Sequence, residues 1–84
     1  MEITIKNKNY KIKYSIRAMF IFEKITGKVF KLETLFDWYI LYYSMILAGN
    51  PDCELMFDEF IDECDNNPSL ITEMQDYLNK QFQM

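Results

Sequence analysis

The sequence predicts a mostly α (α+β) fold, in which an N-terminal two-stranded β-hairpin is followed by about four helices in a small bundle. Apolar and polar residues alternate over "ITIKNKNYKIKY" (residues 3–14), and apolar residues recur at helical spacing in four later segments. The glycines and prolines fall between those segments. The 84 residues have the length of one domain, so we assign 1–84 to a single domain, with 1–14 as the hairpin and 15–84 as helical.

The predicted hairpin has one apolar face. Ile3 and Ile5 alternate with polar neighbours, and Tyr10, Ile12 and Tyr14 do the same after a short Asn/Lys turn. The opposite face carries lysines, as expected of a ribbon that lies on helices. Because two strands alone are marginally stable, we expect the hairpin to pack on the helical part.

The first helix is expected from Ile16 to Thr26, with Ser15 as its N-cap and Gly27 directly after its end. Residues 28–33 connect this helix to the next one. The side chains predicted to face the core are Ala18, Met19, Phe20, Ile21, Phe22 and Ile25.

The second helix, residues 35–48, is almost entirely apolar or aromatic. Thr34 and Asp37 have the spacing of a variant capping box at its start, and Gly49 with Asn50 and Pro51 ends it. A membrane-spanning helix needs about 20 predominantly apolar residues, so this shorter run predicts a buried core helix and no membrane contact.

Two more helices complete the prediction. "LMFDEFIDECD" (residues 55–65) places Phe57, Phe60, Ile61 and Cys64 on one inward stripe. "NNPS" then interrupts the chain, with Asn67 as cap and Pro68 at the first helical position. The last helix has an apolar stripe of Leu70, Ile71, Met74, Tyr77, Leu78 and Phe82.

Composition argues against catalysis. The chain has no histidine, so the commonest general base and metal ligand is missing. Cys53 and Cys64 lack zinc-site spacing, and we expect reduced thiols in a cytoplasmic protein rather than a disulfide. The acids of "DEFIDECD" do not match a calcium loop and are expected to form a solvated helix face. We therefore predict no enzyme, no cofactor and no metal.

Charge is distributed unevenly along the chain. Residues 1–31 hold eight Lys and Arg against two acids, whereas residues 32–84 hold one Lys against eleven acids. We expect the two parts to pair within the fold, and self-association is the alternative. The overall acidity argues against nucleic-acid binding. It leaves open a small acidic inhibitor that mimics DNA and blocks a basic groove of a host protein.

The segment "SIRAMFIFEKITGKVFKLETLFDWYILYYSMILAGNPDCELMFDEFIDECDNNPSL" resembles the small tail assembly chaperones of long-tailed bacteriophages. The features that carry the resemblance are the lysine-rich hairpin, the run from Arg17 to Lys28, the hydrophobic helix with an aromatic first half, the "LAGNPD" break and the "FDEFID" helix. Together they cover roughly residues 1–70. The resemblance implies a non-enzymatic protein in the bacterial cytoplasm. It would bind the hydrophobic helices of the tape-measure protein and help recruit the tail-tube protein.

The second helix has more apolar surface than a small core can cover. Tyrosine, tryptophan and methionine are enriched at protein contact surfaces because they combine apolar area with adaptable or polar ends. We therefore predict that part of the aromatic cluster stays accessible and receives apolar helices of a partner. The candidate partner-binding residues are Trp38, Tyr39, Tyr42, Tyr43 and Met45.

Overall fold

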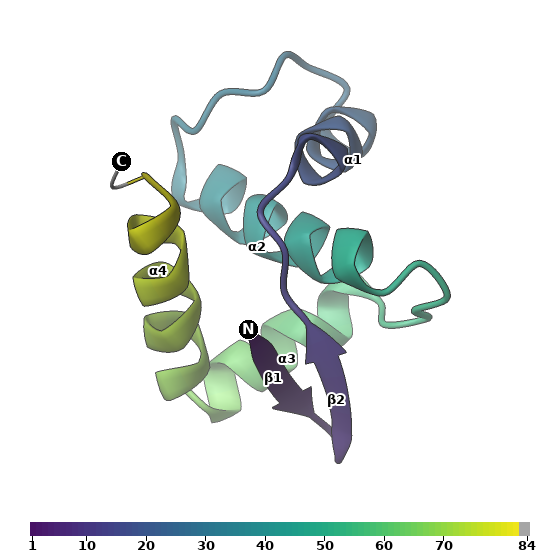
Figure 1. Ribbon diagram of the computed structural model, residues 1–84, viewed down its shortest axis with the longest axis vertical. Coiled ribbons are helices and arrows are strands. Elements are labelled where there is room, and N and C mark those ends of the chain that lie inside the picture. The colour runs from purple at the N-terminus through teal and green to yellow at the C-terminus, as the bar shows by residue number, and fades with distance from the viewer. Residues whose placement is uncertain (83–84) are drawn as a thin grey trace.

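The computed structural model describes residues 1–82 and confirms a mostly α fold with an N-terminal hairpin (Figure 1). Its buried side chains form one hydrophobic cluster to which the hairpin and all four helices contribute. No helix among the described residues has the length and apolarity needed to span a membrane. The elements in chain order are β1 Glu2–Ile5, β2 Lys8–Lys11, α1 Ile16–Thr26, α2 Leu35–Gly49, α3 Phe57–Asn66 and α4 Ser69–Phe82.

The hairpin is closed by a tight turn at Lys6 and Asn7, which both have positive φ (52° and 66°). Such a turn matches the twist of the strands. Ile3 lies opposite Tyr10, and both side chains are buried against the helices. The strands end earlier than predicted, at Lys11, and residues 12–14 continue as extended chain.

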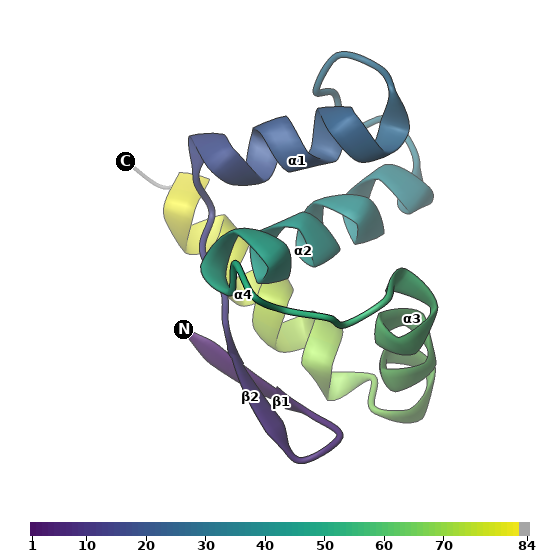
Figure 2. The same ribbon diagram turned by 90° about the vertical axis from the view of Figure 1, so that its right-hand side faces the viewer.

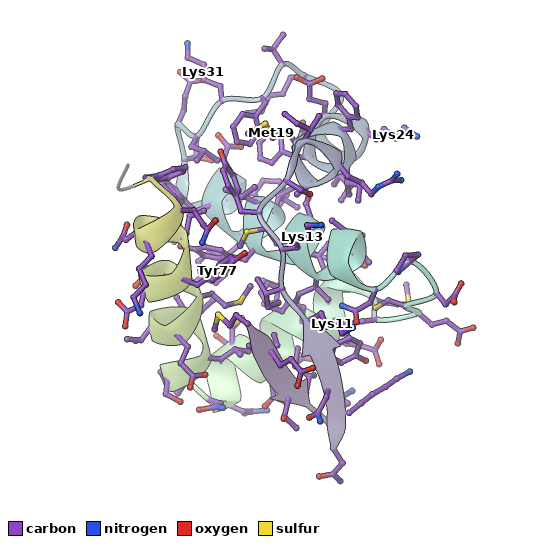
Figure 3. The ribbon with its side chains drawn as sticks, viewed as in Figure 1. Lys11, Lys13, Met19, Lys24, Lys31 and Tyr77 are labelled. Atoms are coloured by element: carbon purple, nitrogen blue, oxygen red, sulfur yellow. The ribbon has the colours of Figure 1, made fainter. Side chains whose placement is uncertain are left out.

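The extended segment after β2 is held by α4. Tyr77 points from α4 toward this segment (Figure 3), and its hydroxyl accepts a hydrogen bond from the backbone N–H of Tyr14 at 3.3 Å. Ile12 is buried, and its N–H donates to the carbonyl of Met1 at 2.8 Å. The segment therefore connects the hairpin to α1 while covering part of the core.

Helix α1 begins and ends where the sequence predicts. The Ser15 side chain accepts a hydrogen bond from the N–H of Ala18, and Gly27 adopts the left-handed conformation with φ 71°. The helix packs across α2 (Figure 2). The predicted inward stripe is too wide, because Phe20 and Ile25 are 60% and 43% exposed.

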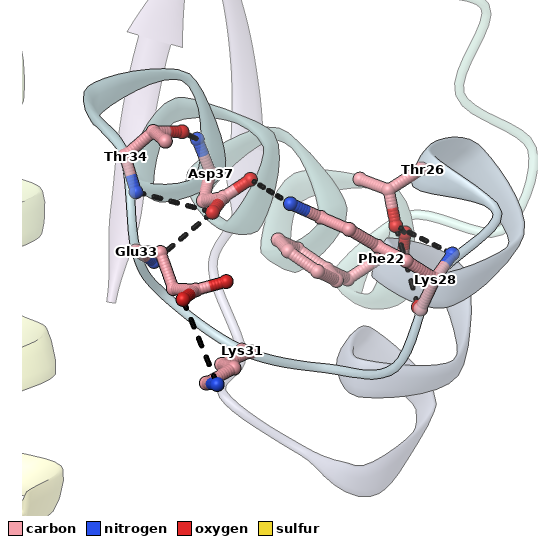
Figure 4. Close-up of polar contacts among 7 residues, drawn as sticks. All are labelled: Phe22, Thr26, Lys28, Lys31, Glu33, Thr34 and Asp37. Carbon is pink, nitrogen blue, oxygen red and sulfur yellow. Dashed lines mark hydrogen bonds and ion pairs between the residues drawn. The ribbon is translucent and has the colours of Figure 1, made fainter.

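The capping box at the start of α2 is confirmed, and its carboxylate also anchors the preceding loop (Figure 4). Asp37 is buried and accepts hydrogen bonds from the N–H groups of Glu33 and Thr34 at 3.0 and 3.1 Å. Lys28 forms an ion pair with it at 3.0 Å. These contacts, the hydrogen bond from Glu33 first, lower the pKa of Asp37.

The C-terminal end of α2 lies against β2. The side-chain amide of Asn50 donates to the carbonyl of Lys11 at 2.8 Å, and its oxygen accepts from the N–H of Lys11 at 3.2 Å. Asn50 thus occupies the outer edge of β2 in the way that a neighbouring strand would. Gly49 allows this approach, because a Cβ there would meet the backbone of Lys11.

Helices α3 and α4 place most of their predicted apolar stripes inward, but Phe82 at the end of α4 is 48% exposed. Helix α4 begins at Ser69, so Pro68 precedes the helix instead of occupying its first position. Phe60 and Cys64 of α3 are buried, as are Leu70, Met74 and Leu78 of α4. Both cysteines are unpaired, Cys64 in the core and Cys53 in the loop before α3. The ion pairs within residues 1–82 each join a base from residues 1–31 to an acid from residues 32–84: Lys6–Glu59, Lys28–Asp37 and Lys31–Glu33.

Candidate functional site

Three of the five predicted partner-binding residues lie together around an open pocket. Trp38, Tyr39 and Tyr42 project from the N-terminal half of α2 toward α4 and line a space of about 320 Å³. We call this space the α2–α4 pocket. Its other lining residues are Leu35 from α2, and Gln75, Asp76, Leu78 and Asn79 from α4.

Tyr42 forms the floor of the aromatic cluster. Its ring centroid lies 6.5 Å from that of Trp38 and 5.8 Å from that of Tyr39, which it meets nearly edge to face. Tyr42 is only 2% exposed, whereas Trp38 and Tyr39 are half-buried. Burial raises the pKa of Tyr42, and an interaction with the side chain of Gln75 lowers it by less. The raised pKa keeps the hydroxyl of Tyr42 protonated at physiological pH.

Met45 is not available to a partner in this structure. Helical spacing placed it on the same face as Trp38, but its side chain is fully buried. The extended chain after β2 crosses α2 here, and the N–H of Lys13 lies 3.4 Å from the carbonyl of Met45. The prediction for Met45 is corrected for this reason: the face is covered at its C-terminal end and open only at its N-terminal end.

Tyr43 lies outside the pocket as well. Its ring packs against α3, with centroids 5.4 Å from Phe57 and 6.1 Å from Phe60. Its hydroxyl donates a hydrogen bond to the carbonyl of Leu55 at 2.5 Å. Tyr43 therefore ties α2 to the start of α3. It is half-buried, as Trp38 and Tyr39 are, but only those two of the half-buried residues line the α2–α4 pocket.

The rim of the pocket includes apolar surface that was not among the predicted site residues. Leu35 lines the pocket and is 74% exposed. Its neighbour Phe36 is also exposed, at 58%, but lies outside the pocket and packs on Phe57 of α3 with 5.9 Å between the ring centroids. The four α4 residues were also missed. No signal in the sequence could assign them, because which face of α4 meets α2 depends on the tertiary packing.

The possible metal ligands, the buried thiol and the buried carboxylate of the described residues have the following environments. Among residues 1–82 no group of three or more His, Cys, Asp or Glu side chains lies close enough to hold a metal ion. Burial raises the pKa of Cys64 to about 11, so its thiol is protonated at neutral pH. The only buried carboxylate found in residues 1–82, that of Asp37, is occupied by its capping and ion-pair contacts. The geometry described here suits non-covalent binding.

Comparison of the chain with models of known protein families, with curated proteins and with solved structures found no match. The function is therefore argued from the α2–α4 pocket and from the sequence resemblance alone.

Proposed function

We propose that this protein is a tail assembly chaperone of a long-tailed bacteriophage, which binds hydrophobic helices of the tape-measure protein and aids assembly of the tail tube. The observation that carries the proposal is the open aromatic pocket at the N-terminal half of α2. Trp38 and Tyr39 offer large apolar areas with polar tips there, and the exposed Leu35 extends the surface. The resemblance in sequence supplies the identity of the client.

The mode of binding would be a helix lying in a groove. The two walls of the α2–α4 pocket are helices, and its volume of about 320 Å³ can accept side chains of a client helix rather than the whole helix. Burial of one leucine-sized side chain contributes about 1.5–3 kcal/mol. Binding through few such anchors is weak enough to be reversed, as assembly requires of a chaperone.

The first experiment is to sequence the DNA downstream of the gene. Many tail assembly chaperones are made in two lengths by programmed ribosomal frameshifting, so we expect a slippery stretch near the stop codon. A very long reading frame that encodes a helical and partly hydrophobic protein should follow it. The product of that frame would then be co-expressed with this chain, and its recovery in the soluble fraction would be measured. A long helical client that stays equally soluble without the chaperone would contradict the proposal.

Serine substitutions locate the binding surface. Trp38→Ser and Tyr39→Ser should lower client recovery. Both side chains pack on the hydrophobic core, so the substitutions also lower the melting temperature, and recovery is compared at a temperature at which each variant is still folded. Phe20→Ser is the matched control, because Phe20 is an aromatic residue of α1 with 60% exposure and lies outside the pocket. Equal client recovery with all three variants would show that the pocket is not the site.

Salt dependence separates the chaperone from the acidic inhibitor. Burial of apolar side chains changes little with ionic strength, whereas ion pairs with a basic groove weaken steeply as salt is added. We expect client binding to persist at high salt. The acidic-inhibitor hypothesis is favoured if binding is lost at high salt and is lost equally when exposed acids of α3, such as Asp58 and Asp62, are neutralised.

A further inference from the structure

The α2–α4 pocket has one aromatic wall and one polar wall. Trp38, Tyr39 and Tyr42 come from α2, whereas α4 contributes the carboxylate of Asp76 and the side-chain amides of Gln75 and Asn79. A purely apolar occupant would lie against these polar groups and separate them from water. Polar groups that lose water without gaining a partner cost free energy, so the polar wall favours an occupant that can bond to it.

The electrostatic surroundings of the pocket favour a cation. Both walls come from residues 32–84, the part of the chain with eleven acids and one lysine. Asp76 is exposed and forms no ion pair with any residue in 1–82, although Lys80 lies one turn further along the same helix. A carboxylate beside aromatic rings attracts a positive group both through its charge and through the ring faces.

We propose that the α2–α4 pocket binds a basic side chain, preferentially arginine, of the client helix. The aliphatic stem would lie on Leu35 and Trp38, and the charged end would reach Asp76. The amide oxygens of Gln75 and Asn79 can accept further hydrogen bonds. Arginine is preferred to lysine because its planar guanidinium stacks on aromatic rings and pairs with a carboxylate through two hydrogen bonds. This inference rests on the proposed function and adds a requirement for charge in the client.

The test uses peptides as defined probes. An amphipathic peptide of about 15 residues, long enough to form a helix on binding, carries a leucine stripe and one central arginine. Two sister peptides carry norleucine or glutamate in place of the arginine. Trp38 is the only tryptophan of the chain and lines the pocket, so its fluorescence reports occupancy directly.

We expect the arginine peptide to bind most tightly and the glutamate peptide most weakly. Asp76→Asn removes the charge while keeping nearly the same side-chain shape. It should weaken binding of the arginine peptide by about two- to fivefold, as expected for a partly exposed ion pair. The same variant should leave the norleucine peptide unchanged. Asp62→Asn is the control, because Asp62 is an exposed acid of α3 outside the pocket and should affect neither peptide.

Three results would overturn the inference. If the norleucine peptide binds as tightly as the arginine peptide and Asp76→Asn changes the affinity for neither, the pocket is only an apolar site. The proposed chaperone function is not contradicted by that result. If no peptide changes the fluorescence of Trp38 although the client is still recovered on co-expression, the pocket is not the basic-residue site. Loss of both peptide binding and client recovery would overturn the inference together with the function.

Discussion

Replacement of Gly49 by alanine tests how the hairpin is joined to α2. Gly49 is the last residue of α2, and a Cβ added there would contact the carbonyl oxygen of Lys11 and lie 2.9 Å from its carbonyl carbon. The obstacle is backbone rather than a flexible side chain, so β2 and α2 must move apart. That movement also loosens the two hydrogen bonds between Asn50 and Lys11.

The magnitude follows from these contacts. Overpacking costs about 1–3 kcal/mol, and loss of the two hydrogen bonds adds about 1 kcal/mol each. The better helix propensity of alanine offsets up to about 1 kcal/mol. We therefore expect Gly49→Ala to lower the free energy of unfolding by about 2–4 kcal/mol, which lowers the melting temperature of a domain this size by roughly 10–25 °C.

Urea unfolding followed by circular dichroism measures the change, and hydrogen exchange at the N–H of Lys11 shows whether its bond to Asn50 is lost. Gly27→Ala is the comparison: a Cβ there meets no atom within 4 Å, so only the left-handed φ of 71° should cost stability, by about 1–2 kcal/mol. If Gly49→Ala is as stable as the unmodified protein and Lys11 stays protected, the close approach does not hold the hairpin in place.

Three further predictions concern single side chains. Folding lowers the pKa of Asp37, so its carboxylate stabilises the protein above its ordinary pKa, and this stabilisation is lost when the group is protonated. The difference in melting temperature between the unmodified protein and Asp37→Asn should therefore narrow as the pH falls below about 4. A difference that stays constant with pH would contradict this. A thiol reagent at neutral pH should modify Cys53 quickly and Cys64 only on unfolding, because burial raises the pKa of Cys64 to about 11; equal rates would contradict its burial. Met45→Ala should lower the free energy of unfolding by about 2–5 kcal/mol, and Tyr43→Phe should lower it by about 0.5–1.5 kcal/mol. Neither variant should reduce client binding while the protein stays folded. If a folded variant of either residue loses client binding, the binding site lies elsewhere than the α2–α4 pocket.

The N-terminal caps of α1 and α2 could be predicted from the sequence because their partners lie within four residues along the chain, whereas the contact between Met56 and Glu59 at the start of α3 was not predicted. Ser15 bonds to Ala18, and Thr34 with Asp37 closes a capping box, as their spacing indicates. The helical spacing of apolar residues likewise predicted the buried side chains of α3 and α4. These signals are local, so they survive whatever the tertiary arrangement is.

The division of α2 could not be predicted in the same way. A helical wheel shows which residues share a face, but not how far along the helix that face is covered. Trp38 and Met45 share a face, yet one lines a pocket and the other is fully buried. The prediction for Gly49 was incomplete for the same reason. The sequence indicates that a helix ends there, whereas the contact with Lys11 depends on where the hairpin meets α2.

The position of the uncovered surface bears on its purpose. The C-terminal half of α2 is largely enclosed, and Met45 and Ile46 there are fully buried. At the N-terminal end, Asp37 already anchors the loop and the capping box through polar contacts, so apolar neighbours are not needed to hold the helix start in place. Leu35 nevertheless stays 74% exposed, where a polar residue would keep the helix at little cost in stability. Stability of the fold therefore does not require an apolar side chain at the edge of the aromatic pocket, and the proposed binding of another helix would give Leu35 a partner.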